Sequence, residues 1–151
     1  MIPSTATETE AQTIARLLAT CRCVAVVGLS PKPARASHDV ARVMQAAGWR
    51  IVPVNPVAAG QTILGEPVYA SLHEAAQHAR IDLVNVFRQS EDVPPVVDEA
   101  IAIGAPAIWL QLGIRHGEAA ARARAAGLAV VQDKCLKVEW ARRSVRPGDT
   151  P

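Results

Sequence analysis

VAVVGLSPKPARAS, residues 24–37, is the stretch that decides the fold of this chain. Its first four residues are apolar and mostly β-branched, which is typical of a strand buried on both faces of a parallel sheet. Gly28 follows directly, and we expect it to form a tight turn at the end of the strand. Apolar residues at helical spacing begin after Ser37, which is the predicted N-cap. The stretch therefore predicts a strand, a glycine turn and a helix N-terminus in succession.

This strand–turn–helix unit has the features of a phosphate-binding site. The N–H groups of a first helical turn and the positive end of the helix dipole attract an anion. Lys32 and Arg35 add two positive charges to the same loop. The dinucleotide fingerprint G-x-G-x-x-G needs three glycines, however, and only Gly28 is present. A structural turn with two solvated cations is the alternative that this stretch alone leaves open.

Length and composition favour one domain with an aliphatic core. The chain has 151 residues, of which 50% are hydrophobic but only 3% aromatic, and aliphatic cores are typical of buried parallel sheets. A net charge of +2 gives no electrostatic reason to expect nucleic-acid binding. No apolar run approaches the ~20 residues that cross a bilayer, and the opening MIPSTATETE lacks the regions of a signal peptide. We expect a cytoplasmic protein that binds neither nucleic acid nor membrane.

Strand-like and helical patterns alternate along the rest of the chain, with residues 58–66 irregular. The further strands are expected at 50–54, 82–87, 107–111 and 128–131, and helical patterns separate them. This alternation predicts an α/β fold, a Rossmann-like doubly wound parallel sheet. We expect a single domain over residues 1–151, with its core at about 15–142 and a loose tail at 144–151.

Two further strand ends contribute candidate binding residues. The strand at 50–54 ends in Asn55 and Pro56, where NAD-binding units usually place a carboxylate for the ribose hydroxyls. A neutral strand end beside Lys32 and Arg35 is better suited to a nucleotide with a phosphate on its ribose. Ligands of open α/β sheets bind beyond the carboxyl ends of the strands. At the next such end Phe87 could pack on a base and Arg88 could reach a phosphate, unless both are local structural residues.

The three cysteines predict no metal site and no disulfide framework. Cys21 and Cys23 are followed by no second Cys/His pair at the spacing of metal ligands. Cys135 lies between two lysines, which favour a thiolate, but no general base is identifiable for it. A structural or redox-sensitive thiol is therefore favoured over a catalytic one.

Six motifs occur in an order that resembles the stand-alone CoA-binding domain proteins of bacteria. They are GLSPKPARAS, IVPVNP, ILGEPVYASL, NVFR, AIWLQLGI and VVQDKCLKVE. That family is similar to the CoA-binding domain of the succinyl-CoA synthetase α-subunit, so the resemblance implies coenzyme A bound across the carboxyl ends of a Rossmann-like sheet. The residues it implies are Gly28, Leu29, Ser30, Lys32, Pro33, Arg35 and Ser37 in the phosphate loop, Asn55 and Pro56 after the second strand, and Phe87 and Arg88 facing the pantetheine and diphosphate.

The expected function is binding of coenzyme A or an acyl-CoA without catalysis. The full synthetase uses a phosphorylated histidine in a second domain, and none of the four histidines here lies in a comparable glycine-rich loop. An NAD(P)-dependent oxidoreductase or another small nucleotide-binding enzyme is the alternative, because the fold itself excludes neither. A protein partner and the preferred acyl group are left open.

Overall fold

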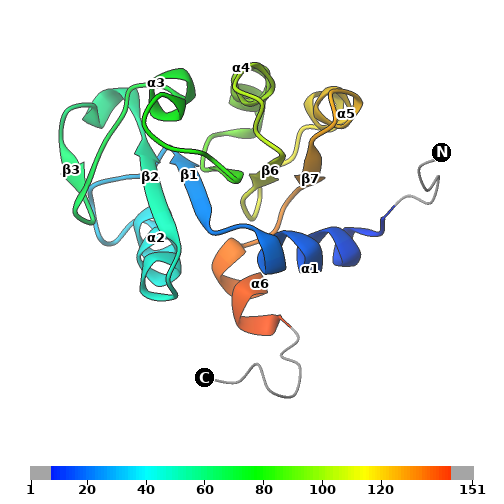
Figure 1. The fold of residues 1–151 in the computed structure, drawn as a ribbon, viewed down its shortest axis with the longest axis horizontal. Coiled ribbons are helices and arrows are strands. Elements are labelled where there is room, and N and C mark those ends of the chain that lie inside the picture. The colour runs from blue at the N-terminus through cyan, green and yellow to red at the C-terminus, as the bar shows by residue number, and fades with distance from the viewer. Residues whose placement is uncertain (1–7, 144–151) are drawn as a thin grey trace.

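The computed structural model, which describes residues 8–143, is built on a five-stranded parallel sheet (Figure 1). In spatial order its strands are β2 (Arg50–Val54), β1 (Cys23–Val27), β5 (Leu83–Val86), β6 (Ala107–Leu110) and β7 (Ala129–Val131). Counted within the sheet, this is the order 2-1-3-4-5 of one doubly wound class. The predicted fold class is confirmed, and the tail expected at 144–151 lies outside the described residues.

Helices cover both faces of the sheet in two layers (Figure 1). One face carries α1 (Glu10–Thr20), α2 (Ala36–Ala46) and α6 (Leu136–Arg142), and the other carries α3 (Leu72–Ala76), α4 (Val93–Ala102) and α5 (Gly117–Ala125). Side chains alternate along each strand, so Val24 and Val26 pack toward the first set while Ala25 and Val27 pack toward the second. Both faces of the sheet are thus buried, as the apolar run in β1 predicts.

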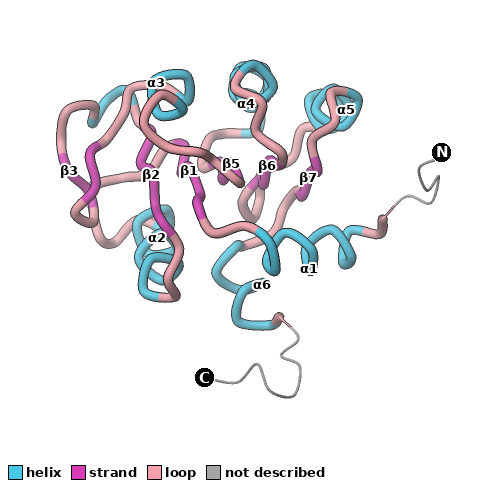
Figure 2. The backbone as a smooth tube through the Cα atoms, viewed as in Figure 1, coloured by secondary structure: helices cyan, strands magenta, loops and turns pink. Residues whose placement is uncertain are grey.

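Short elements lie beside the edge strand β2 and after the carboxyl ends of two strands (Figure 2). A hairpin of β3 (Thr62–Ile63) and β4 (Glu66–Pro67) occupies the stretch that the sequence predicts to be irregular. Two 3-10 turns, Pro56–Ala58 and Ser90–Asp92, follow β2 and β5. Among residues 8–143, none of the helices combines the length and the apolar character that crossing a bilayer requires.

The connections between strands create a topological switch point between β1 and β5. The crossover after β1 runs through α2 on one face, whereas the crossover after β5 runs through α4 on the other. Because β1 and β5 are neighbours in the sheet, the chain leaves their carboxyl ends in opposite directions. A crevice at such a point is where ligands of doubly wound folds bind.

Candidate functional site

Three of the predicted strand ends meet at this switch point. The N–H of Gly28, directly after β1, donates to the carbonyl of Val54 in β2 at 2.8 Å. The N–H of Phe87, directly after β5, donates to the carbonyl of Val27 at 2.8 Å. The residues that sequence analysis selects after three separate strands therefore lie side by side at one edge of the sheet.

The backbone conformation at position 28 and the close packing around it both require a glycine. Its φ of +89° lies in the left-handed region, which glycine enters at little cost. A Cβ at this position would lie 2.2 Å from the carbonyl oxygen of Phe87 and 3.1 Å from Nη1 of Arg88. The sequence predicts the turn, but it does not predict this close approach of the β5 exit. The same contact places the guanidinium of Arg88 directly over Gly28.

Asn55 holds the loop after β1 in place. Its Nδ2 donates to the carbonyl of Leu29 at 3.0 Å, and its Oδ1 accepts from the N–H of Val57 at 3.1 Å. The Leu29 side chain is fully buried among the helices of the α2 face, so only its backbone can face a ligand. Asn55 thus ties the first turn of the loop to the end of β2.

Ser37 is not the N-cap of α2, and that prediction is wrong. The helix begins at Ala36, Arg35 occupies the cap position, and no side chain caps the helix. The Ser37 hydroxyl instead accepts from the N–H of Ser30 at 3.0 Å, across the loop. The Ser30 hydroxyl in turn accepts from the N–H of Lys32 at 3.1 Å. Both hydroxyls therefore shape the loop, and the first N–H groups of α2 stay available to an anion.

Three cationic residues lie in or beside the loop that leads to this uncapped helix end. Lys32 and Arg35 are exposed in the loop, beside the exposed Pro33, while Arg88 is half-buried over Gly28. Within the described part of the chain, none of these three side chains forms an ion pair. Phe87 is half-buried and packs against the core of the α2 face, and Pro56 is exposed at the start of its 3-10 turn.

One acidic residue in the first turns of α2 is paired with two cations, and sequence analysis missed these contacts. Asp39 accepts from Lys137 of α6 and from Arg42, each at 2.6 Å. The hydrogen bond from Lys137, followed by that from Arg42, lowers the pKa of the Asp39 carboxyl. Arg42 at helical spacing could have been found in the sequence, but Lys137 is 98 residues away. Asp39 therefore stays ionised, but the two cations offset its negative charge, which would otherwise repel an anion at this helix end.

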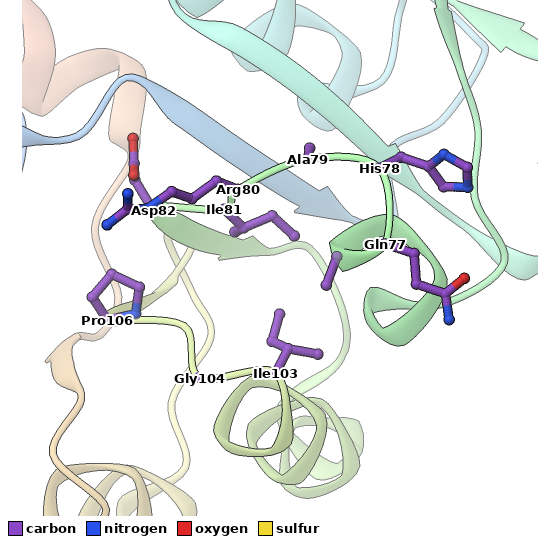
Figure 3. A pocket seen from close by; sticks show the side chains of 10 residues that line it. Gln77, His78, Ala79, Arg80, Ile81, Asp82, Ile103, Gly104 and Pro106 are labelled. Atoms are coloured by element: carbon purple, nitrogen blue, oxygen red, sulfur yellow. The ribbon is translucent and has the colours of Figure 1, made fainter.

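A separate cavity lies at the opposite edge of the sheet (Figure 3). It has a volume of about 680 Å³ and is lined by segments near the amino ends of β5 and β6, among them Arg80, Asp82 and Pro106. The Asp82 carboxylate accepts from the N–H groups of Arg22 and Cys23 at 3.0 Å each, so it fixes the start of β1. None of the site residues predicted from the sequence lines this cavity.

Metal centres and reactive thiols depend on the cysteine, histidine and carboxylate side chains of residues 8–143. This range contains no group of three or more His, Cys, Asp or Glu side chains that could hold a metal ion. The three cysteines are free. Burial raises the pKa of the Cys21 and Cys23 thiols, which makes them less reactive at neutral pH.

Known proteins resemble this chain over most of its length. Residues 22–141 match the family described as CoA binding domain. The Bacillus subtilis (strain 168) protein YneT is 41% identical over 128 residues, which cover 85% of this chain and 92% of that protein. Cell-free ID.343 from Thermus thermophilus has a solved structure that is 34% identical, with a TM-score of 0.79, and the match covers 87% of this chain and 97% of the other. A hypothetical protein from Pyrococcus horikoshii OT3 is 28% identical, with a TM-score of 0.81 and coverage of 93% and 98%.

Proposed function

Because this chain belongs to the CoA-binding domain family, we propose that it binds coenzyme A or an acyl-CoA at the switch point between β1 and β5. The observation that supports this ligand best is the uncapped N-terminus of α2 beside three cations that have no ion-pair partner in residues 8–143. Coenzyme A carries a diphosphate and a ribose 3′-phosphate, which are the groups that such a site attracts.

Each phosphate of coenzyme A has a proposed partner. The diphosphate would lie at the N–H groups of the first turn of α2, with Arg88 above it. Arg35 and Lys32 would meet the ribose 3′-phosphate from the loop. Phe87 would lie along the pantetheine arm.

The other predicted residues would form the backbone of the site or hold it in shape. Gly28, Leu29, Ser30 and Pro33 form the loop, and Ser37, Asn55 and Pro56 hold its shape. In this proposal none of these residues is catalytic, and the protein is a binding module.

The alternative, an NAD(P)-dependent enzyme, is less well supported at the end of β2. NAD-binding units hold the ribose hydroxyls with a carboxylate at this position. Here the position carries Asn55, and both polar atoms of its side chain are already engaged by Leu29 and Val57. The ribose hydroxyls of NAD would therefore lack their usual carboxylate partner here. Coenzyme A carries a phosphate on its ribose and does not depend on that partner.

Calorimetric titration with coenzyme A, NAD and NADP tests the proposed function. We expect coenzyme A to bind more tightly than either dinucleotide, because only coenzyme A combines a diphosphate with a 3′-phosphate for the three cations. NADP serves as the control for a ribose phosphate at a different hydroxyl. Equal or tighter binding of NAD would contradict the proposal.

Replacement of Asn55 tests whether the loop must be held in place. Asn55→Ala leaves the Leu29 carbonyl without its donor, and we expect coenzyme A affinity to fall about five- to tenfold. Asn55→Asp should weaken coenzyme A further, because it places a negative charge near the phosphates, while NAD should lose less. Titration of each variant with both ligands measures the two effects. Unchanged coenzyme A affinity in a folded Asn55→Ala protein would show that binding does not need the hydrogen bond from Asn55 to Leu29.

A further inference from the structure

Exposed apolar side chains flank the cations of the proposed site on both sides. Among residues 8–143 only three large hydrophobic side chains are exposed: Val57 at 89%, Leu112 at 66% and Val138 at 38%. Val57 follows β2 and Leu112 follows β6, so both lie at the carboxyl edge of the sheet, whereas Val138 lies on α6. In the sheet order β2, β1, β5, β6, the carboxyl edge therefore presents Val57, then the cations of the proposed site, and then Leu112.

Leu112 is exposed on a well-anchored turn. The N–H of Ile114 donates to the carbonyl of Gln111 at 2.9 Å, and Gly113 between them has a φ of +84°. The N–H of Gly113 donates to Asp133 Oδ1 at 2.6 Å, and this hydrogen bond lowers the pKa of the Asp133 carboxyl. The exposure of Leu112 is thus built into the fold rather than the result of a loose loop.

Because Phe87 at the end of β5 is proposed to lie along the pantetheine arm, the arm would extend from α2 toward β5 and β6, and Leu112 follows β6. The N–H of Gln111 donates to the carbonyl of Val86 at 3.2 Å, so the ends of β5 and β6 are adjacent and Phe87 is near the Leu112 turn. Two strand spacings, roughly 10 Å, separate β1 from β6. The pantetheine arm has about as many chain atoms as four residues and spans about 13 Å when extended. Its sulfur would therefore arrive at the Leu112 turn.

We propose that Leu112 is the acyl-recognition residue of the site and selects thioesters with a short, apolar acyl group. The proposal rests on the proposed function, because the phosphates must lie at α2 for the sulfur to reach β6. An alkyl chain laid against Leu112 is removed from water, whereas a terminal carboxylate would lose solvation there. Arg115, the cation nearest to Leu112 in the sequence, already donates from its Nε to Asp133 Oδ2 at 3.3 Å, so the carboxylate of Asp133 offsets part of its charge.

The test compares free coenzyme A, butyryl-CoA and succinyl-CoA by calorimetric titration. The two acyl groups have the same number of carbons but differ in the terminal charge. We expect butyryl-CoA to bind at least about fourfold more tightly than coenzyme A. This is the increase in affinity that burial of about one methylene provides. Succinyl-CoA should gain nothing over coenzyme A. Leu112→Ala should abolish the butyryl preference, so that butyryl-CoA and coenzyme A bind this variant equally, while Val138→Ala, the matched control, should keep the preference.

The possible failures are distinguishable. A protein that binds coenzyme A but shows no butyryl preference, or keeps that preference in Leu112→Ala, would overturn the role of Leu112 alone. A protein that binds none of the three ligands would overturn both this role and the proposed function.

Discussion

Gly28→Ala is expected to lower both coenzyme A affinity and protein stability. The added Cβ would lie 2.2 Å from the Phe87 carbonyl oxygen, a backbone atom that cannot rotate away. Either β1 or the exit of β5 must then shift, and Arg88 would move with it. A positive φ and a steric overlap together cost on the order of 2–5 kcal/mol in the free energy of unfolding. We expect coenzyme A binding to become undetectable by calorimetry and urea denaturation to show the loss of stability.

Gly48→Ala provides a matched control for this prediction. Gly48 has a φ of +101°, but a Cβ there would meet no atom within 4 Å. The variant therefore carries the backbone strain alone, far from the phosphate loop, and should bind coenzyme A as the unmodified protein does. If both variants lost equal stability and both bound coenzyme A normally, the approach of Phe87 to Gly28 would have no role in the site.

Arg35→Ala is expected to weaken coenzyme A binding roughly tenfold or more, and by more than Lys32→Ala. An arginine fork can bind two phosphate oxygens at once, whereas lysine acts as a point charge. A hydrogen bond to a charged group contributes about 1.5–3 kcal/mol, which corresponds to a loss of at least about tenfold in affinity. Because Arg35 is exposed and forms no ion pair in the described part of the chain, its removal should leave the fold intact.

Dephospho-CoA shows which phosphate Arg35 meets. It lacks the 3′-phosphate, so a partner of that group should matter much less for its binding. An equal loss for both ligands would assign Arg35 to the diphosphate instead. No loss for either ligand would make Arg35 a solvated surface residue, and the proposed role of the loop would be wrong.

The parts of the fold that follow from local pattern were predictable from the sequence. The strand expected at 50–54 coincides with β2 (Arg50–Val54), and the strand before Gly28 is only one residue longer than expected. Each is a short apolar run rich in β-branched residues and bounded by a turn signal, Gly28 in one case and Asn55-Pro56 in the other, which is the local pattern that indicates a buried strand. The β3–β4 hairpin was missed, because two strands of two residues each are too short to show a period.

The contacts that shape the candidate site could not be predicted in the same way. Ser37 has the residue type and the sequence position expected of an N-cap. Its hydroxyl instead accepts a hydrogen bond from the N–H of Ser30, and only the path of the loop brings these two groups together. Asn55 reaches Leu29 across 26 residues, and the carbonyl that excludes a side chain at Gly28 belongs to Phe87, which follows a different strand. Sequence pattern indicated which residues follow the carboxyl ends of the strands, while tertiary contacts determine how those residues are arranged.

A crystal structure of the protein with coenzyme A bound would locate the phosphates without further inference. We predict the diphosphate at the first N–H groups of α2, beside Gly28 and Arg88, with the 3′-phosphate at Arg35. The pantetheine arm should run past Phe87 toward β6. Coenzyme A bound instead at the amino ends of the strands, in the cavity lined by Arg80 and Pro106, would contradict this placement.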